Sequence, residues 1–334
     1  MMDYDKILQS ERSFDPENWD EMEHLAHQMV TDIFDMLKDI RDKPVWTKPT
    51  KKVSTSIFGE GLPQKPQSIH KIYDKIKEDI FPYNKGNIHP KFWSWVQSTG
   101  TPFSVLAEML AAGLNPDVCT GDHAPMYIES QTIDWLKKLF EFPETGSGVL
   151  VSGTSMANLT ALLIARDVCT HQIVREKGLY QYDSQMVLYA SVETHSCITK
   201  AADIIGLGKE AVRLIKTDDN FRIDIEELKH RIQEDKNAGL MPFCVVANVG
   251  TVNTGAIDPL HEIVTICKKE KLWLHIDGAF GAFAKLVPEF RETLKPIEEA
   301  DSIAFDLHKW MSLPVGIGCV LVKDREAHRK SIAM

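Results

Sequence analysis

The sequence predicts an α/β fold in which a mostly parallel sheet lies between layers of helices, preceded by a helical N-terminal segment. From residue 148 onward, short strand segments rich in Val, Ile and Leu alternate with amphipathic helical segments. Strands and helices in this alternation form parallel sheets that are covered on both faces. In such sheets ligands gather at the carboxyl ends of the strands, so the residues that follow each strand are the candidates for chemistry.

The N-terminal part of the chain contains two amphipathic segments. Residues 16–41 form an acidic segment whose apolar side chains recur at helical spacing, and we expect a helix there. An extended stretch containing Pro and Lys is expected over residues 42–66, and a second helix over residues 69–80. We therefore expect an N-terminal helical and extended segment over residues 1–100 and a large domain over residues 101–334.

Seven strands and four helices are expected in the large domain. The strand segments are 149–153, 186–191, 211–217, 243–250, 272–280, 302–310 and 318–324. The first helix ends at Arg166, and the others are expected over 196–206, 223–235 and 260–269.

Composition favours a small-molecule partner. Hydrophobic residues make up 43% of the 334 residues, which is ample for a large core, and the formal net charge of −10 gives no field that attracts nucleic acid or an anionic membrane. The six cysteines are dispersed without a CxxC pair, which indicates free thiols in a reducing compartment. No targeting signal opens the chain and no apolar run reaches the ~18 residues of a membrane span, so we expect a cytoplasmic protein.

Lys309 and Asp277 are the strongest candidates for chemistry. Each ends an apolar strand segment, Asp277 in LWLHIDGAF and Lys309 in SIAFDLHKW. A lysine that forms an imine with an aldehyde and an aspartate that faces a pyridinium nitrogen are the minimum apparatus for pyridoxal phosphate. Gly278 and Ala279 leave room for a flat ring against the backbone. The alternatives are a salt bridge from Asp277 to an arginine and a solvated Lys309 at a strand end.

Weaker signals follow three other strands. Thr154 and Ser155 come after Gly153 at the start of a helix, where hydroxyls and free N–H groups suit a phosphate, although an ordinary N-cap is the commoner explanation. His195 can lie on an aromatic ligand or donate a proton, but a lone histidine is more often structural. Thr251 offers a hydroxyl at the end of another strand.

Other types of site match the sequence poorly. The HEIVT segment at 261–265 lacks the second histidine that a zinc-protease helix requires, and we expect no metal. No Walker loop and no GxGxxG follows the strand at 149–153, and the GxSxG of a serine hydrolase is absent.

The segment HPKFWSWVQSTGTP is dense in aromatic and then in small hydroxyl residues. We interpret it as a pocket wall, with plain core packing as the alternative. Its aromatic side chains suit a bulky aromatic substrate, which we favour slightly, while its hydroxyls suit a polar or acidic one. The candidate pocket residues are His89, Trp93, Trp95, Ser98 and Thr99.

Taken in order, six segments of the chain resemble the group II pyridoxal-phosphate-dependent decarboxylases, which include aromatic-L-amino-acid, histidine and glutamate decarboxylases. The segments are HPKFWSWVQSTGTP, SGTSMANLTALLIAR, ETHSCITKAADIIGLG, ANVGTVNTGAIDPL, LWLHIDGAFGAF and DSIAFDLHKW. The resemblance implies an aspartate-aminotransferase-type (fold type I) large domain. It also implies a homodimer with its active sites at the subunit interface, with the N-terminal helices packed on the other subunit.

The resemblance implies a role for each candidate. Lys309 would hold the cofactor covalently, and Asp277 would pair with its pyridine nitrogen. His195 would stack on the ring opposite Ala279. The phosphate would be held by Thr154, Ser155 and His308, with Thr251 near the cofactor. The reaction implied is decarboxylation of an L-amino acid, aromatic or acidic, to its amine.

Family members ordinarily continue past this sheet, through a mobile loop that carries a tyrosine, into a C-terminal small domain. The sequence ends at Met334, and we expect a C-terminally truncated member that lacks the small domain. Transamination or carbon–carbon lyase chemistry on the same cofactor stays open as an alternative. So does a catalytically impaired chain that serves as an interaction partner.

Overall fold

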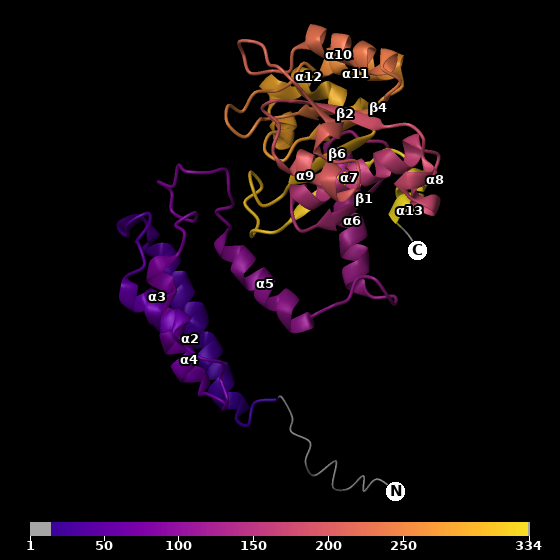
Figure 1. Ribbon diagram of the computed structural model, residues 1–334. Helices are drawn as coiled ribbons and strands as arrows, with labels where there is room; N and C mark the ends of the chain where they lie inside the picture. The colour runs from indigo at the N-terminus through magenta and orange to yellow at the C-terminus, as the bar shows by residue number, and fades with distance from the viewer. Residues whose placement is uncertain (1–14, 333–334) are drawn as a thin grey trace, which may run out of the picture. The chain divides into compact units, whose positions relative to one another are not determined.

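The computed structural model divides the chain into two compact units, Met1–Trp93 and Ser94–Met334 (Figure 1). It describes residues 15–332. Residues 1–14, in which we expect no targeting signal, lie outside the described residues. Across the described part of the chain, no helix is both long and apolar enough to cross a membrane.

The first unit is helical. Its two longer helices are α2 (Trp19–Lys38) and α4 (Ile69–Asp79), as the spacing of apolar residues predicts. Polar contacts join them, because the Tyr73 hydroxyl donates a 2.8 Å hydrogen bond to Asp32 and the Lys77 ammonium lies 2.7 Å from the same carboxylate. Short 3₁₀ turns, η1 (Ile40–Asp42) and η2 (Phe81–Tyr83), follow the two helices.

One expectation for the first unit is wrong. The stretch 42–66, expected to be extended, contains the helix α3 (Lys51–Phe58). Thr50 caps this helix by accepting a hydrogen bond from the Val53 N–H, and a Thr at this position stabilises a helix start. The prolines around the segment obscured a short helix that lies between them.

The second unit is built on a seven-stranded sheet with the order β1-β7-β6-β5-β4-β2-β3. β7 runs antiparallel to both of its neighbours, and the other neighbouring pairs are parallel. The expected mostly parallel sheet is thus confirmed. The strands are β1 (Ser147–Val151), β2 (Met186–Ser191), β3 (Val212–Ile215), β4 (Met241–Asn248), β5 (Trp273–Asp277), β6 (Ser302–Asp306) and β7 (Gly318–Val322).

The second unit also contains helices, including the four that the sequence predicts. The α-helices are α5 (Pro102–Leu114), α6 (Ala124–Leu139), α7 (Thr154–Cys169), α8 (Ile173–Lys177), α9 (Cys197–Ile204), α10 (Ile225–Asn237), α11 (Leu260–Glu270), α12 (Arg291–Leu294) and α13 (Arg325–Ile332). The 3₁₀ turns are η3 (Leu179–Gln181), η4 (Lys209–Ala211), η5 (Ala282–Leu286), η6 (Pro288–Phe290) and η7 (Lys295–Glu299).

The sheet separates two hydrophobic cores. Successive side chains of a strand point to opposite faces, so in β4 Val245 and Ala247 enter one core while Cys244 and Val246 enter the other. Helices α6, α10, α11 and α12 cover the first core, and α7, α9 and α13 cover the second. Burial on both faces explains why the strand segments read as continuous apolar runs.

The register of the parallel strands places polar residues side by side at the carboxyl ends of the strands. Asn248 at the end of β4 is the partner of Asp277 at the end of β5, and Asp277 is the partner of Ala304 in β6. At these carboxyl ends, β7 begins at Gly318. A Cβ there would lie 2.5 Å from the backbone of Gly153, so only glycine lets the turn after β1 pack against β7.

Candidate active site

Lys309 lies just beyond the carboxyl end of β6. Its ammonium group is 3.1 Å from the Asp306 carboxylate, and its side chain is 19% exposed. Asp306 is buried and also accepts a 2.7 Å hydrogen bond from the backbone N–H of Thr154, the first residue of α7. Asp306 therefore ties Lys309 to the first turn of α7.

Asp277 is buried at the carboxyl end of the neighbouring strand β5. Its Oδ1 accepts a hydrogen bond from the backbone N–H of Ala279 (3.1 Å), and its Oδ2 accepts one from the side-chain amide of Asn158 (2.9 Å). Burial raises the pKa of Asp277, while these two hydrogen bonds and the charges of Lys309 and His195 act in the opposite direction. Both hydrogen-bond donors are neutral, so a cationic ligand would stabilise the ionised carboxylate.

The first turn of α7 suits an anion. Gly153 precedes it at a φ of +97°, a conformation that residues with side chains rarely adopt. The Thr154 hydroxyl is buried and has no hydrogen-bond partner among the described residues, and Ser155 is exposed beside it. An unpaired buried hydroxyl costs free energy, so the turn fits a ligand oxygen at the N-terminus of this 16-residue helix.

His308 lies beside this turn. A Cβ added at Gly153 would be 3.7 Å from the His308 ring. Nδ1 of His308 is 3.0 Å from the carbonyl oxygen of Ile317 and donates to it, which leaves Nε2 available to a ligand. The structure thus brings His308 close to Gly153, at the turn where the sequence predicts a phosphate.

His195 and Thr251 follow β2 and β4. His195 is exposed, and its Nδ1 accepts a 3.2 Å hydrogen bond from the backbone N–H of Cys197, so the hydrogen of the neutral ring is on Nε2. Thr251 is buried, and its hydroxyl lies 2.7 Å from that of Thr254 within its own turn. Its predicted place near the cofactor stays a prediction.

The candidate pocket residues are divided between the two units. Ser98 donates a hydrogen bond to the carbonyl of Leu313, in the loop after Lys309, and accepts one from the Gly100 N–H (3.0 Å). The neighbouring residues Trp95 and Thr99 are exposed. In the first unit, His89 is buried, with Nδ1 accepting the Lys91 N–H, and Trp93 is 91% exposed. Their role in binding substrate stays a prediction.

Three residues that the sequence reasoning missed contact the candidates directly or through one neighbour. They are Asp306, Asn158 and His275. Two of them carry a signal in the spacing, since Asp306 lies three residues before Lys309 and His275 lies two residues before Asp277, on the same face of β5. Asn158 carries none, because only the packing of α7 on the sheet brings it to Asp277.

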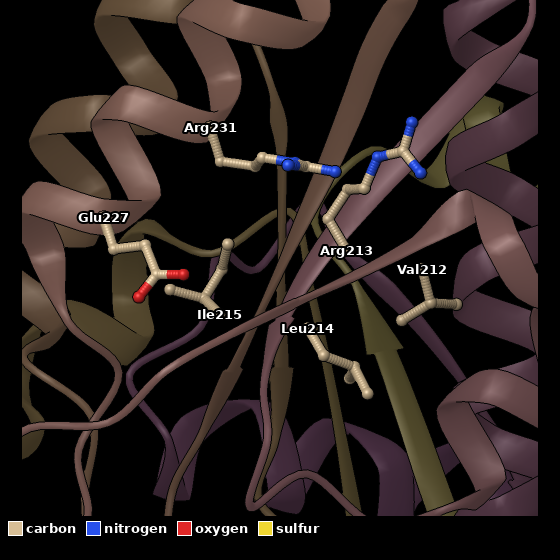
Figure 2. A pocket seen from close by; sticks show the side chains of 6 residues that line it. All are labelled: Val212, Arg213, Leu214, Ile215, Glu227 and Arg231. Atoms are coloured by element: carbon tan, nitrogen blue, oxygen red, sulfur yellow. The ribbon is translucent and has the colours of Figure 1, made fainter.

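A pocket elsewhere on the sheet has a different character. It lies beside the edge strand β3 and α10, where Arg231 extends toward Arg213 (Figure 2). Both arginines face Asp235, with their Nε atoms at 3.9 Å and 3.2 Å from its carboxylate. The charges are paired within the protein, so we interpret these groups as a connection between the sheet and α10. The lining residues are Val212, Arg213, Leu214, Ile215, Glu227 and Arg231.

Comparison with known proteins identifies one family. A family model described as the pyridoxal-dependent decarboxylase conserved domain matches residues 52–334. An aromatic-L-amino-acid decarboxylase of Bacillus atrophaeus is 33% identical over 317 residues, which cover 94% of this chain and 64% of the relative. A phenylacetaldehyde synthase of Petunia hybrida is 32% identical over 329 residues, which cover 96% and 63%. The solved structure of Catharanthus roseus tryptophan decarboxylase in complex with L-tryptophan matches with a TM-score of 0.85 at 28% identity, covering 96% of this chain and 70% of that one.

Site and fold together define a protein that binds pyridoxal phosphate, and the residues fit this cofactor. The orphaned Thr154 hydroxyl suits the phosphate, the incompletely compensated Asp277 suits a pyridinium, and the amine of Lys309 suits the aldehyde. The chain belongs to the pyridoxal-dependent decarboxylase family, which confirms the resemblance, the fold class and the cofactor. It spans less than two thirds of the length of the two curated relatives named above.

Proposed function

We propose that the chain forms the cofactor-binding part of an enzyme that decarboxylates an L-amino acid to its amine. The observation that carries this proposal is the position of Asp277 and Lys309 at the carboxyl ends of the adjacent parallel strands β5 and β6. The names of the decarboxylases among the relatives support it. When bound, pyridoxal phosphate supplies a ring that accepts the electrons of the broken bond between Cα and the carboxylate.

In this proposal each residue has a separate task. Lys309 would hold the coenzyme through its side-chain amine. Asp277 holds a proton on the pyridine nitrogen, which keeps the ring a good acceptor of electrons. His195 would lie on the ring face opposite Ala279. The phosphate is bound by Thr154, Ser155 and His308, and Thr251 lies near the coenzyme.

We propose an aromatic amino acid as the substrate. Phe280, which follows Ala279, and Trp310, which follows Lys309, pack edge to face with ring centroids 4.7 Å apart. A pair of aromatic rings next to Ala279 and Lys309 suits a substrate with an aromatic side chain. The aromatic residues Trp93 and Trp95 are kept as candidate pocket residues, together with His89. An acidic substrate held by Ser98 and Thr99 is the alternative.

Different chemistry on the same cofactor is the second candidate. The Petunia relative is named for an aldehyde product, although it is about as similar to this chain as the Bacillus decarboxylase. Fold and cofactor alone do not fix the reaction. Products should therefore be assayed for the amine and for the aldehyde in parallel.

We also propose a homodimer with active sites at the interface. Helix α5 is strongly apolar, yet Phe103, Leu110 and Leu114 are 78%, 62% and 74% exposed, which a partner surface would relieve. The N-terminal segment, expected over residues 1–100, would add to that interface. The expected cytoplasmic location also stays a proposal, and all six cysteines are free thiols, as it requires.

The test is reductive trapping. Purified protein with pyridoxal phosphate should show an imine absorption band that disappears on borohydride treatment, and mass spectrometry should find the added mass on Lys309. Lys309→Ala should abolish both. Lys323→Ala is the matched control. Lys323 also follows a strand, but this strand, β7, is antiparallel, so Lys323 lies at the amino ends of the parallel strands. Trapping at any other lysine would contradict the proposed role of Lys309.

Turnover is measured separately, as carbon dioxide release from each amino acid. Release from an aromatic amino acid, abolished by Lys309→Ala, supports the full proposal. Trapping on Lys309 without release from any amino acid supports instead a chain that binds the cofactor and acts as an interaction partner.

A further inference from the structure

A continuous chain of hydrogen bonds runs through the core from Trp273 to Asp277. The indole Nε1 of Trp273 donates to Ser302 Oγ (2.8 Å), which lies 2.9 Å from His275 Nδ1. Nε2 of His275 lies 2.8 Å from Asn158 Oδ1, and the amide nitrogen of Asn158 donates to Asp277 Oδ2 (2.9 Å). The three inner members are fully buried, so water does not substitute for any of these bonds.

The fold brings these side chains together from three elements. Trp273, His275 and Asp277 alternate along β5 and share one face of the sheet. Ser302 is the register partner of His275 in the neighbouring strand β6. Asn158 belongs to α7, the helix that covers this face.

The donor at one end sets the direction of the protons. An indole N–H can only donate, so Ser302 accepts from Trp273 and turns its own hydrogen to Nδ1 of His275. Burial lowers the pKa of His275 to about 3, so the ring is neutral and carries its one hydrogen on Nε2. That hydrogen is donated to the Asn158 oxygen, which leaves only N–H groups of Asn158 to face Asp277.

The reverse direction of donation would leave the hydroxyl hydrogen of Ser302 without an acceptor. A protonated Asp277 that donated to Asn158 would make His275 donate from Nδ1 to Ser302. The Ser302 oxygen would then accept two hydrogen bonds. Its own hydrogen would have no acceptor, because within residues 15–332 no third group hydrogen-bonds this hydroxyl. The direction of donation along the hydrogen bonds therefore requires Asp277 to accept, as an ionised carboxylate does. The Ala279 N–H likewise donates to the other carboxylate oxygen.

We propose that Asn158 and His275 are positioning residues that keep Asp277 ionised and aimed at the pyridine nitrogen, with Trp273 setting the direction. This inference rests on the role proposed for Asp277. Hydrogen bonds in a chain polarise one another, and the low dielectric of the core strengthens each of them. Here all four bonds polarise toward the carboxylate.

Other titratable groups also face Asp277. His195 lies in the turn after β2, and Lys309 follows β6; the charges of both favour an ionised Asp277. Cys197 of α9 accepts a 3.2 Å hydrogen bond from the Asn158 amide, and burial raises the pKa of its thiol to about 12, so it stays neutral. The hydrogen-bond chain from Trp273 to Asp277, which we call the relay, is the uncharged contribution to keeping Asp277 ionised. Neither salt nor the titration of a surface group removes it.

The first test uses the full chain without cofactor. Nitrogen-15 NMR should show His275 with a hydrogen on Nε2 and none on Nδ1, unchanged from about pH 5 to about pH 8. A hydrogen on Nδ1, or a ring that titrates in this range, overturns the proposed direction.

The second test removes the relay. His275→Phe keeps a planar ring but removes both nitrogens, and Asn158→Leu removes the direct donor. In each variant the pKa of Asp277, followed by carbon-13 NMR in the cofactor-free protein, should rise. Affinity for pyridoxal phosphate should fall roughly tenfold, with the larger loss in Asn158→Leu. The matched control is Val246→Ala, the buried register partner of His275 in β4, which costs stability but should leave the pKa of Asp277 unchanged.

A labelled coenzyme separates the two proposals. With nitrogen-15 pyridoxal phosphate bound, the parent should show a protonated pyridine nitrogen, and Asp277→Asn should lose it. If Asp277→Asn keeps it, the role proposed for Asp277 is wrong, while the measurements without cofactor still judge the relay. If His275→Phe and Asn158→Leu leave the pKa of Asp277 and the affinity at the parent values, the relay alone is overturned.

Discussion

Two buried carboxylates in the same domain differ in how their charge is compensated. Asp235 in α10 accepts hydrogen bonds from the Tyr189 hydroxyl (2.9 Å) and Arg213 (3.2 Å), and Arg231 lies 3.9 Å away. The protein therefore supplies the positive charge itself. Asp277, in contrast, accepts hydrogen bonds from two neutral donors, and burial raises its pKa.

Two lysines show the same contrast. Lys285 is buried, donates to the carbonyl of Phe140 (2.9 Å) and lies 3.0 Å and 3.3 Å from Glu298 and Glu141. Among residues 15–332, Lys309 has one carboxylate partner, at 3.1 Å, and part of its side chain is exposed at the carboxyl end of β6. Burial alone thus does not mark a functional group. A buried group whose charge or hydrogen bond the protein leaves incomplete does, because a ligand must complete it.

Removing the compensated carboxylate should have the largest effect on stability. Asp235→Ala leaves the Tyr189 hydroxyl without its acceptor and Arg213 without its counter-charge. We expect the free energy of unfolding to fall by about 2 kcal/mol, measured by urea denaturation. Affinity for pyridoxal phosphate should not change. A loss of affinity greater than the loss of stability would break the contrast with Asp277.

The incompletely compensated carboxylate of Asp277 should affect instead how stability depends on pH. Because burial raises its pKa, folded Asp277 keeps its proton to a higher pH than the unfolded chain does. Its contribution to stability is therefore fully present below the ordinary pKa of aspartate and is lost as the pH rises through the folded pKa. In cofactor-free protein, the free energy of unfolding of the parent minus that of Asp277→Asn should fall by about 1 kcal/mol or more between about pH 4 and about pH 7. A difference that stays constant over this range would show that the charge of Asp277 is compensated within the protein.

Two buried threonines give the smallest and most local comparison. The Thr170 hydroxyl donates to the carbonyl of Arg166 (2.9 Å), whereas the Thr154 hydroxyl has no partner among the described residues. Thr170→Val should cost about 1 kcal/mol in the free energy of unfolding. Thr154→Val should cost nothing in the cofactor-free protein and should weaken binding of pyridoxal phosphate several-fold, measured by fluorescence titration. Equal costs for the two variants would mean that the Thr154 hydroxyl is already paired.

The strands were predictable because burial on both faces leaves a strong signal in the chain itself. All seven strand segments are present, and the four predicted helices follow where expected. The helix α3 was missed, since its eight residues are too few for a clear period and prolines stand on either side. The cap residue Thr50 was the one local signal for it.

By itself, the sequence determined which residues stand at the ends of strands, and so named Asp277, Lys309 and the Thr154 turn. That information is local, because a strand's composition and the polar residue that follows it are read along the chain. The tertiary structure alone decided that Asn158 of α7 and Ser302 of β6 meet His275, and that Asp306 joins Lys309 to the start of α7. These contacts depend on strand register and on which helix covers which face, and no spacing along the chain encodes either.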